Sequence, residues 1–205
     1  MPGREFRATN ASASNLVEFV YGVHPRQITG APDWFRADKF NIVGTPDREG
    51  LPSREQWLTV VKKLLADRWQ LKFHREQKEL PVYAIQIGKG GPKLTKSAGD
   101  PNAAGSFLFK GGTLTARNGS AVLDRPVIDQ TGLDGKWDFV LTWTREGNQM
   151  ANLGLEPRPA VSDPNPYGPL DLVSAMQDEL GLKLLSTKAT VDVIAVDQVE
   201  KPSGN

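Results

Sequence analysis

The feature that most constrains the fold is an internal repeat, because the residues between Phe6 and Ile87 resemble those between Leu114 and Val199. Segment 6–10 (Phe-Arg-Ala-Thr-Asn) corresponds to segment 114–118 (Leu-Thr-Ala-Arg-Asn). A repeat length of about a hundred residues is typical of duplicated domains, whereas solenoid repeats are about 20–50 residues long. The sequence therefore predicts an α+β fold with two tandem modules of β-α-β-β type, each with a small mixed sheet.

Two helices are expected in the first module. Asn10 or Ser12 can cap the first, because a short polar side chain accepts a hydrogen bond from an unpaired backbone N–H at a helix start. Its buried face carries Leu16, Phe19 and Val20. The second helix begins near Ser53 and has apolar residues at a spacing of about 3.6. These residues are Trp57, Leu58, Val61, Leu64 and Leu65.

Strands are expected around these helices. Residues 40–43 alternate as a half-buried strand, and residues 69–73 and 82–87 alternate on either side of a polar stretch, which is typical of a hairpin. In the second module, residues 182–184 and 191–194 follow a helix over 172–180.

The module boundaries follow from composition. Residues 1–88 form the first module, residues 89–112 are a connecting segment rich in Gly, Lys and Ser, and residues 113–205 form the second module, with a proline-rich loop at 144–169. The second module is one helix short, because seven residues separate Asn118 from Pro126, whereas an average helix needs about 11–12.

Composition excludes several classes of partner and cofactor. The chain has 25 basic and 24 acidic residues and a net charge of +1, so no overall field attracts nucleic acid. Without cysteine it forms no disulfide or thiolate metal site, and its two histidines lack the spacing of a helical metal-binding pair. We expect no cofactor, no metal and no membrane insertion, and the start of this chain lacks the apolar core of a secretion signal.

Four segments together resemble a known family. They are Val127–Phe139 (VIDQTGLDGKWDF), Gln27–Trp34 (QITGAPDW), Leu64–Glu76 (LLADRWQLKFHRE) and the ending Ile194–Asn205. The chain is similar to a bacterial family of unknown function that is abundant in soil acidobacteria. The resemblance implies an extracytoplasmic (periplasmic or secreted) location, a secretion signal and an extra strand upstream of Phe6, and in some members fusion to membrane metallopeptidases. It implies no catalytic residue.

The order of elements also resembles the small N-terminal domains of secretins and of TonB-dependent signalling receptors. That likeness implies docking of other envelope proteins, as an analogy at the level of the fold.

His74 is the candidate catalytic residue. Asp67 and Glu76 lie nearby in the sequence, and an imidazole beside a carboxylate is the arrangement that general-base catalysis requires. No serine is recognisably placed as a nucleophile for it. Catalysis at His74 is therefore the weaker interpretation.

Asp129-Gln130-Thr131-Gly132 contains residues of the Asp-Thr-Gly motif of aspartic proteases, but the spacing is wrong and no second copy exists. We interpret it as a turn in which Asp129 and Thr131 bond backbone groups and Gly132 or Gly135 takes a positive φ.

Two basic stretches have competing interpretations. Residues 89–93 and 110–113 contain Lys and Gly but do not fit a phosphate-binding loop, and we expect turns there. A basic cluster with Trp69 among its members can bind phosphate or stack on a base, but a charged solvated face is the favoured interpretation. This cluster consists of Lys62, Lys63, Arg68, Lys72 and Arg75.

Trp34 and Trp143 are the aromatic residues least explained by a core, so either becomes an interface anchor if it is exposed. Together these features predict a non-enzymatic, extracytoplasmic interaction or sensing protein that binds an envelope protein through a sheet edge or the Trp34 region. The alternatives are a hydrolase using His74 with a nearby carboxylate, and a protein that binds a small ligand. The oligomeric state stays open.

Overall fold

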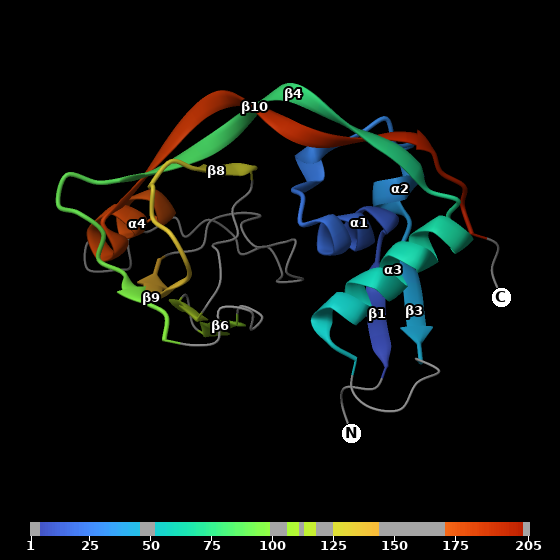
Figure 1. Cartoon of the computed structure of the whole chain (residues 1–205), viewed down its shortest axis with the longest axis horizontal. Helices are drawn as coiled ribbons and strands as arrows, with labels where there is room; N and C mark the ends of the chain where they lie inside the picture. The colour runs from blue at the N-terminus through green and yellow to red at the C-terminus, as the bar shows by residue number, and fades with distance from the viewer. Residues whose placement is uncertain are drawn as a thin grey trace, which may run out of the picture. The chain divides into compact units, whose positions relative to one another are not determined.

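The computed structural model describes residues 5–45, 52–98, 106–110, 113–117, 125–143 and 171–202. Helices combine with small mixed sheets, so the predicted α+β class is confirmed. The chain divides into unit 1 (Met1–Leu80 and Ala189–Asn205) and unit 2 (Pro81–Lys188). Residues 189–205, the end of the predicted second module, thus lie in unit 1. The division crosses the two longest strands, β4 (Lys72–Ile87) and β10 (Leu182–Gln198), so each strand serves both units (Figure 1).

Unit 1 contains helices and short strands from the first part of the chain. They are β1 (Phe6–Ala11), α1 (Ala13–Tyr21), the 3-10 helix η1 (Pro25–Gln27), β2 (Ile28–Thr29), α2 (Trp34–Ala37), β3 (Phe40–Gly44) and α3 (Arg54–Arg68). β1 pairs with β3 in antiparallel fashion, with Phe6 opposite Gly44 and Ala8 opposite Ile42. β2 pairs in parallel with β10, with Ile28 opposite Ile194.

The described residues of unit 2 form short strands and a helix. They are β5 (Thr95–Lys96), β6 (Ser106–Lys110), β7 (Thr113–Arg117), β8 (Val127–Asp129), β9 (Trp137–Thr142) and α4 (Leu172–Leu180). One sheet has the order β5-β9-β7-β6. β8 pairs in parallel with β4, with Tyr83 opposite Val127.

A pairing pattern recurs in the two halves of the chain. The antiparallel pair β1–β3 has a counterpart in the antiparallel pair β7–β9. The short strand β2 pairs with β10 from the second half, and β8 pairs with β4 from the first half. The two halves therefore exchange their last strands, which a simple tandem arrangement does not require. The position of the helix expected to be missing after Asn118 falls largely outside the described residues.

The helices start where local chemistry places them. Ser12 caps α1 and Ser53 caps α3, each in a reciprocal pair with the side chain of the third helical residue, Asn15 or Gln56. Such pairs satisfy two backbone donors that no helical carbonyl can reach. Asp171 caps α4 by accepting from Val173 and Ser174.

Each unit has its own apolar core. The core of unit 1 joins both long helices to the returning strand β10 and consists of Ala13, Leu16, Val17, Val20, Ile28, Phe35, Val61, Leu65, Trp69, Leu71 and Ile194. The core of unit 2 packs α4 against β9 and β10 and consists of Leu141, Trp143, Ala175, Met176, Leu180, Leu182 and Leu184. Packing in these cores fixes the positions of the helices and strands that carry the surface residues described below.

The predicted hairpin over residues 69–73 and 82–87 is wrong. Trp69 follows α3 and is buried, and one continuous strand runs from Lys72 to Ile87 through the polar stretch and Pro81. Residues 182–184 and 191–194 likewise belong to one strand. Polar residues are compatible with these strands because most residues of their middle sections are solvent-exposed.

Two adjacent leucines test the unit 1 core. Leu65 is 1% exposed, whereas Leu64 is only partly buried. We expect Leu65→Ala to lower the free energy of unfolding by about 2–5 kcal/mol, because it removes packed atoms and leaves a cavity. Leu64→Ala should cost clearly less. Chemical denaturation of both variants checks this order, and equal losses would contradict the core assignment.

Two glycines that end helices test the packing of unit 2. Gly22 after α1 and Gly181 after α4 have φ values of +64° and +66°, but a Cβ at Gly181 would clash with the Gly91 carbonyl oxygen, whereas Gly22 faces open space. Gly22→Ala should cost about 1 kcal/mol from backbone strain alone. Gly181→Ala must also displace the Gly91 backbone, so we expect a substantially larger fall in melting temperature. Equal shifts would show that the two caps are alike.

Candidate functional site

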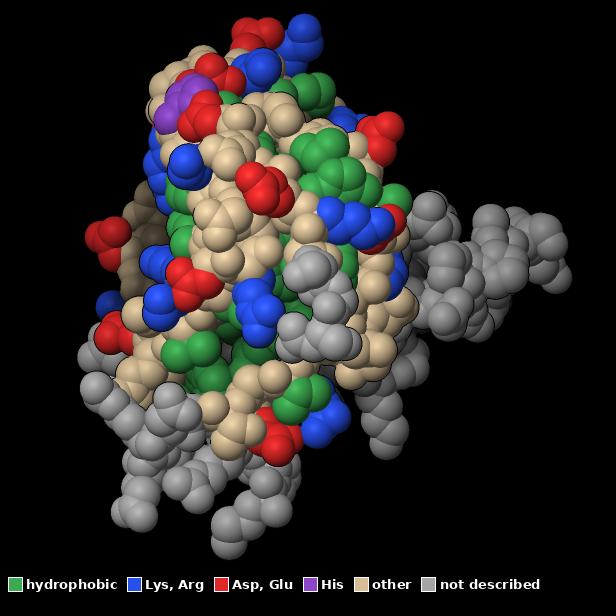
Figure 2. Space-filling view, turned by 90° about the vertical axis from the view of Figure 1, so that its right-hand side faces the viewer, with side chains coloured by type: hydrophobic (Ala, Val, Ile, Leu, Met, Phe, Trp, Pro, Cys, Tyr) green, Lys and Arg blue, Asp and Glu red, His purple; other side chains and the backbone are tan. Residues whose placement is uncertain are grey.

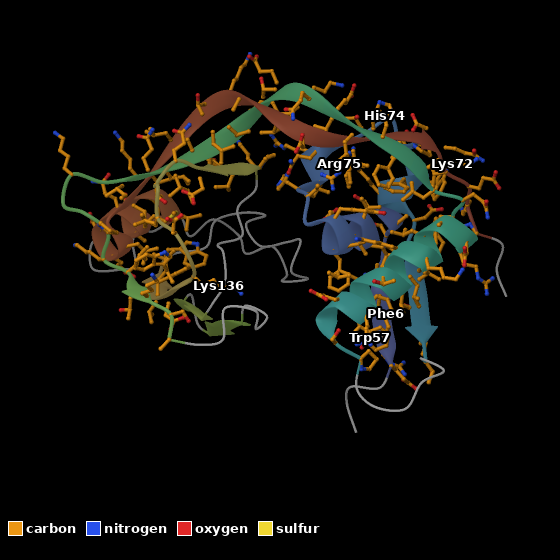
Figure 3. All side chains as sticks on the ribbon, viewed as in Figure 1. Phe6, Trp57, Lys72, His74, Arg75 and Lys136 are labelled. Atoms are coloured by element: carbon orange, nitrogen blue, oxygen red, sulfur yellow. The ribbon has the colours of Figure 1, made fainter. Side chains whose placement is uncertain are left out.

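His74 lies on the part of β4 that belongs to unit 1, beside the end of β10. Its Nδ1 is 2.8 Å from Oδ1 of Asp197, and the two side chains are 56% and 49% exposed. Figure 3 shows His74 on the outer side of the strand. The imidazole and carboxylate that general-base chemistry requires are thus in contact, but in open solvent.

The carboxylate that contacts His74 belongs to Asp197, whereas the sequence predicted Asp67 or Glu76. Asp67 lies in the last turn of α3 and pairs with Lys63, with 2.7 Å between Nζ and Oδ2. Glu76 follows on β4, and Nζ of Lys78 lies 3.8 Å from its Oε1. Asp197 is 123 residues from His74 in the chain. Sequence proximity thus favoured the wrong carboxylates, since the pairing of distant strands brings this one to the imidazole.

The chemistry available to this pair is limited. Among the described residues, no hydroxyl group bonds His74, and no group of three or more His, Asp or Glu side chains could hold a metal ion. An exposed side-chain contact of this kind contributes little to stability, since even exposed ion pairs contribute only about 0–1 kcal/mol. The pair therefore fastens β10 to β4 weakly and lacks a nucleophile within the described part of the chain.

The two predicted interface tryptophans are not free anchors. Trp143 is 2% exposed and belongs to the unit 2 core, so the exposure that an anchor role requires is absent. Trp34 is partly buried against the unit 1 core, with its ring centroid 6.0 Å from that of Phe35. Its packing leaves only part of the indole for a partner.

Asp129 and Thr131 form a turn after β8. Oδ1 of Asp129 accepts from the backbone N–H of Thr131 at 2.8 Å and from its hydroxyl at 2.7 Å, while the Thr131 hydroxyl accepts from the N–H of Leu133 at 3.1 Å. Gly132 and Gly135 have φ values of +68° and +92°. The Asp129 and Thr131 side chains thus accept hydrogen bonds from backbone N–H groups, and the two glycines adopt positive φ angles, as is typical of a turn.

An apolar surface lies where β1, α1 and α3 meet. We define the aromatic patch as Phe6, Phe19, Trp57 and Val60. The Phe6 ring lies 6.2 Å from that of Phe19 and 5.9 Å from that of Trp57, and Figure 3 shows Phe6 and Trp57 next to each other. Phe19 is 46% exposed. Val60, three residues after Trp57 on α3 and so its neighbour on the helix surface, is 44% exposed. Phe19 was expected in the core, because helical spacing cannot show which neighbours cover a face.

The basic cluster is a charged solvated face. The Lys62 Nζ atom lies 5.5 Å from the centroid of the Tyr21 ring, and Lys63 pairs with Asp67. Trp69 is only 3% exposed, so its indole is not available for stacking on a base. Figure 2 shows acidic and basic side chains interspersed on the face it draws. A mixed surface of this kind does not attract a polyanion.

A cavity of about 530 Å³ lies within unit 2, between the Gly88–Lys93 loop and the end of α4. Backbone groups tie the two together: the N–H of Gly88 donates to the Gly181 carbonyl at 2.8 Å, and the N–H of Lys93 donates to the Leu180 carbonyl at 2.8 Å. The predicted turn over residues 89–93 therefore also forms one wall of a cavity.

The pKa of the Glu18 carboxyl group is raised. Burial on α1 raises the pKa of its carboxyl above the ordinary value, although the Ser14 hydroxyl donates to Oε1 at 2.8 Å and lowers the pKa in part. By contrast, hydrogen bonds from the Ser174 side chain and backbone lower the pKa of Asp171 at the start of α4. Both shifts have structural causes.

Glu18→Gln should stabilise the chain at neutral pH. A raised folded-state pKa means that stability is fully present below the unfolded-state value near 4.5 and is lost as pH rises through the folded-state pKa. Glutamine keeps an oxygen for Ser14 and removes this loss. We expect a higher melting temperature for the variant at pH 7 and no difference at about pH 3.5. A lower melting temperature at pH 7 would show that the ionised carboxylate is stabilising.

Comparison with known proteins supports membership of a family of unknown function. No helix of the described residues is both long and apolar enough to cross a bilayer. Searches of curated proteins and of solved structures found no match to the chain. A family model described as "Protein of unknown function (DUF3738)" matches residues 14–199. Since this match covers most of both units, the chain belongs to the DUF3738 family.

Proposed function

We propose that this chain is a non-enzymatic protein that works outside the cytoplasm and binds an extended segment of an envelope protein. The segment adds as a third strand to the β1–β3 sheet and packs beside the aromatic patch. The observation that carries this proposal is the position of an open two-stranded sheet directly next to exposed aromatic side chains in unit 1.

The sheet provides the hydrogen-bonding groups. β1 and β3 pair with each other, and no other described strand joins them. Each outer edge therefore presents backbone N–H and C=O groups that a new strand can pair with. Two strands alone are marginal in water, and a third strengthens such a sheet. Strand addition is a common mode of peptide recognition that takes its affinity from these backbone groups.

The aromatic patch provides the apolar contact. Phe6 belongs to β1 itself, so a side chain of an added strand can reach the surface that continues through Phe19 and Trp57. Aromatic residues at the centre of a protein interface contribute most of its binding energy. Phe19 and Val60 both keep more than two-fifths of their surface free for this purpose, being 46% and 44% exposed.

The location and the class of partner rest on resemblance. The family resemblance implies an extracytoplasmic location, and the order of elements resembles that of secretin and TonB-receptor domains, which dock other envelope proteins. Both likenesses support an envelope protein as the partner.

A hydrolase is the second candidate, and the contact between His74 and Asp197 is the observation in its favour. About half of each side chain is exposed, 56% and 49%. A catalytic base gains most from a site that excludes water, where its interactions are strong. The strand-addition proposal therefore ranks higher.

A peptide-display selection on the whole chain tests the proposal. We expect the enriched peptides to alternate apolar and polar residues, because alternate side chains of an added strand face the sheet's apolar side. Val60→Glu should weaken binding of a selected peptide at least about tenfold, since it places a charge in the apolar contact. Val173→Glu on α4 is the matched control, because Val60 and Val173 are 44% and 46% exposed.

Melting temperatures and calorimetric titrations separate binding from folding. The proposal holds if both variants melt like the parent chain and only Val60→Glu loses the peptide. It fails if no peptide is enriched, or if Val60→Glu binds as tightly as Val173→Glu.

A further inference from the structure

We propose that the cavity of unit 2 is a binding site for a phosphate group carried by a small molecule. We call it the lysine cradle and define it by the Gly88–Lys93 loop together with Gln177, Asp178, Gly181 and Lys183. This site lies in a different unit from the aromatic patch and does not depend on the strand-addition proposal.

The cavity is lined by more basic than acidic side chains. Three lysines, at positions 89, 93 and 183, line the cavity against one acidic side chain, Asp178. The chain as a whole carries a net charge of only +1, so this is a local concentration of positive charge. Within the described residues, no hydrogen bond or ion pair engages the ammonium groups of Lys89 and Lys183. Lysine is a common binder of phosphate as a compact point charge.

The Gly88–Lys93 loop also offers backbone N–H groups to a ligand. The N–H groups of Gly88, Gly91 and Lys93 are used within the unit. Those of Lys89 and Gly90, at the exposed tip, donate to no backbone carbonyl of the described residues. An added Cβ at Gly90 would meet no atom within 4 Å, so the tip is open to an approaching group. Consecutive backbone N–H groups in a turn form a concavity that favours anions.

The end of α4 also lies at the cavity, and the carbonyls of a helix end carry partial negative charge. Several of these carbonyls already accept hydrogen bonds. The Lys93 ammonium donates to the Asp178 carbonyl at 2.7 Å, its backbone N–H donates to that of Leu180, and the Gly181 N–H donates to that of Gln177 at 3.1 Å. Lys93 retains further ammonium hydrogens for a ligand.

Size decides between a bare ion and a larger ligand. A cavity of about 530 Å³ is within the range of about 300–1,000 Å³ that is typical of small-molecule sites. A phosphate held by the lysines leaves room for an organic group next to Gln177, whose amide both donates and accepts hydrogen bonds. The ligand class is therefore a phosphomonoester, with inorganic phosphate as its minimal form.

Titrations followed by ¹H–¹⁵N NMR test the lysine cradle. The probes are inorganic phosphate, glycerol 3-phosphate and, as a comparison, acetate, all at constant ionic strength. We expect saturable shifts for the amides of Lys89, Gly90 and Gly181 with both phosphates, and none with acetate. Saturation by glycerol 3-phosphate at lower concentration than by phosphate would show that the rest of the cavity takes part.

Charge-removing variants give the second readout. Lys89→Gln and Lys183→Gln should each weaken phosphate binding about three- to tenfold, as expected for loss of one charged contact. Lys96→Gln, on β5 of the same unit but outside the cavity, should leave it unchanged. Shifts that grow linearly without saturation, equal shifts with acetate, or equal weakening by Lys96→Gln would each overturn the proposal.

Discussion

The structure depends on two long strands that each belong to both compact units. β4 leaves unit 1 after Leu80 and β10 returns to it at Ala189, so the core of unit 1 is completed by residues from the far end of the chain. Ile194 shows the constraint most directly, because it is fully buried in the unit 1 core and pairs with Ile28 of β2. The candidate surfaces of unit 1 therefore rest on contacts between residues more than a hundred positions apart.

The parts of the fold that could be predicted are those with local causes. Ser53 was predicted as a helix start, and Ser12 was one of two predicted candidates beside Asn10, because a cap needs only its neighbours in sequence. Both long strands were predicted as separate pieces. In β4, the polar residues after His74 and the proline at position 81 break the alternation that identifies a strand. Alternation of apolar and polar residues requires that one face of the strand is buried, whereas most residues in the middle of β4 are exposed.

The functional surfaces were harder to predict for the same reason. His74 was singled out by its residue type, but its partner Asp197 depends on strand pairing across 123 residues. Phe19 has the helical spacing of a core residue and is exposed, while Trp143 lacks an obvious core pattern and is buried. In each case neighbours from distant segments decide the exposure. The cavity beside the Gly88–Lys93 loop likewise needs the end of α4, some ninety residues later in the chain, as its second wall.

The return of β10 to unit 1 has a consequence for synthesis. A ribosome releases the first eighty residues of the chain long before residues 189–205, and domains generally begin to fold as they emerge. Until the last residues arrive, Ile28 and the rest of its core lack the strand that covers them. Between the synthesis of its first eighty residues and that of β10, a nascent chain therefore exposes an incomplete apolar core, a condition that favours aggregation.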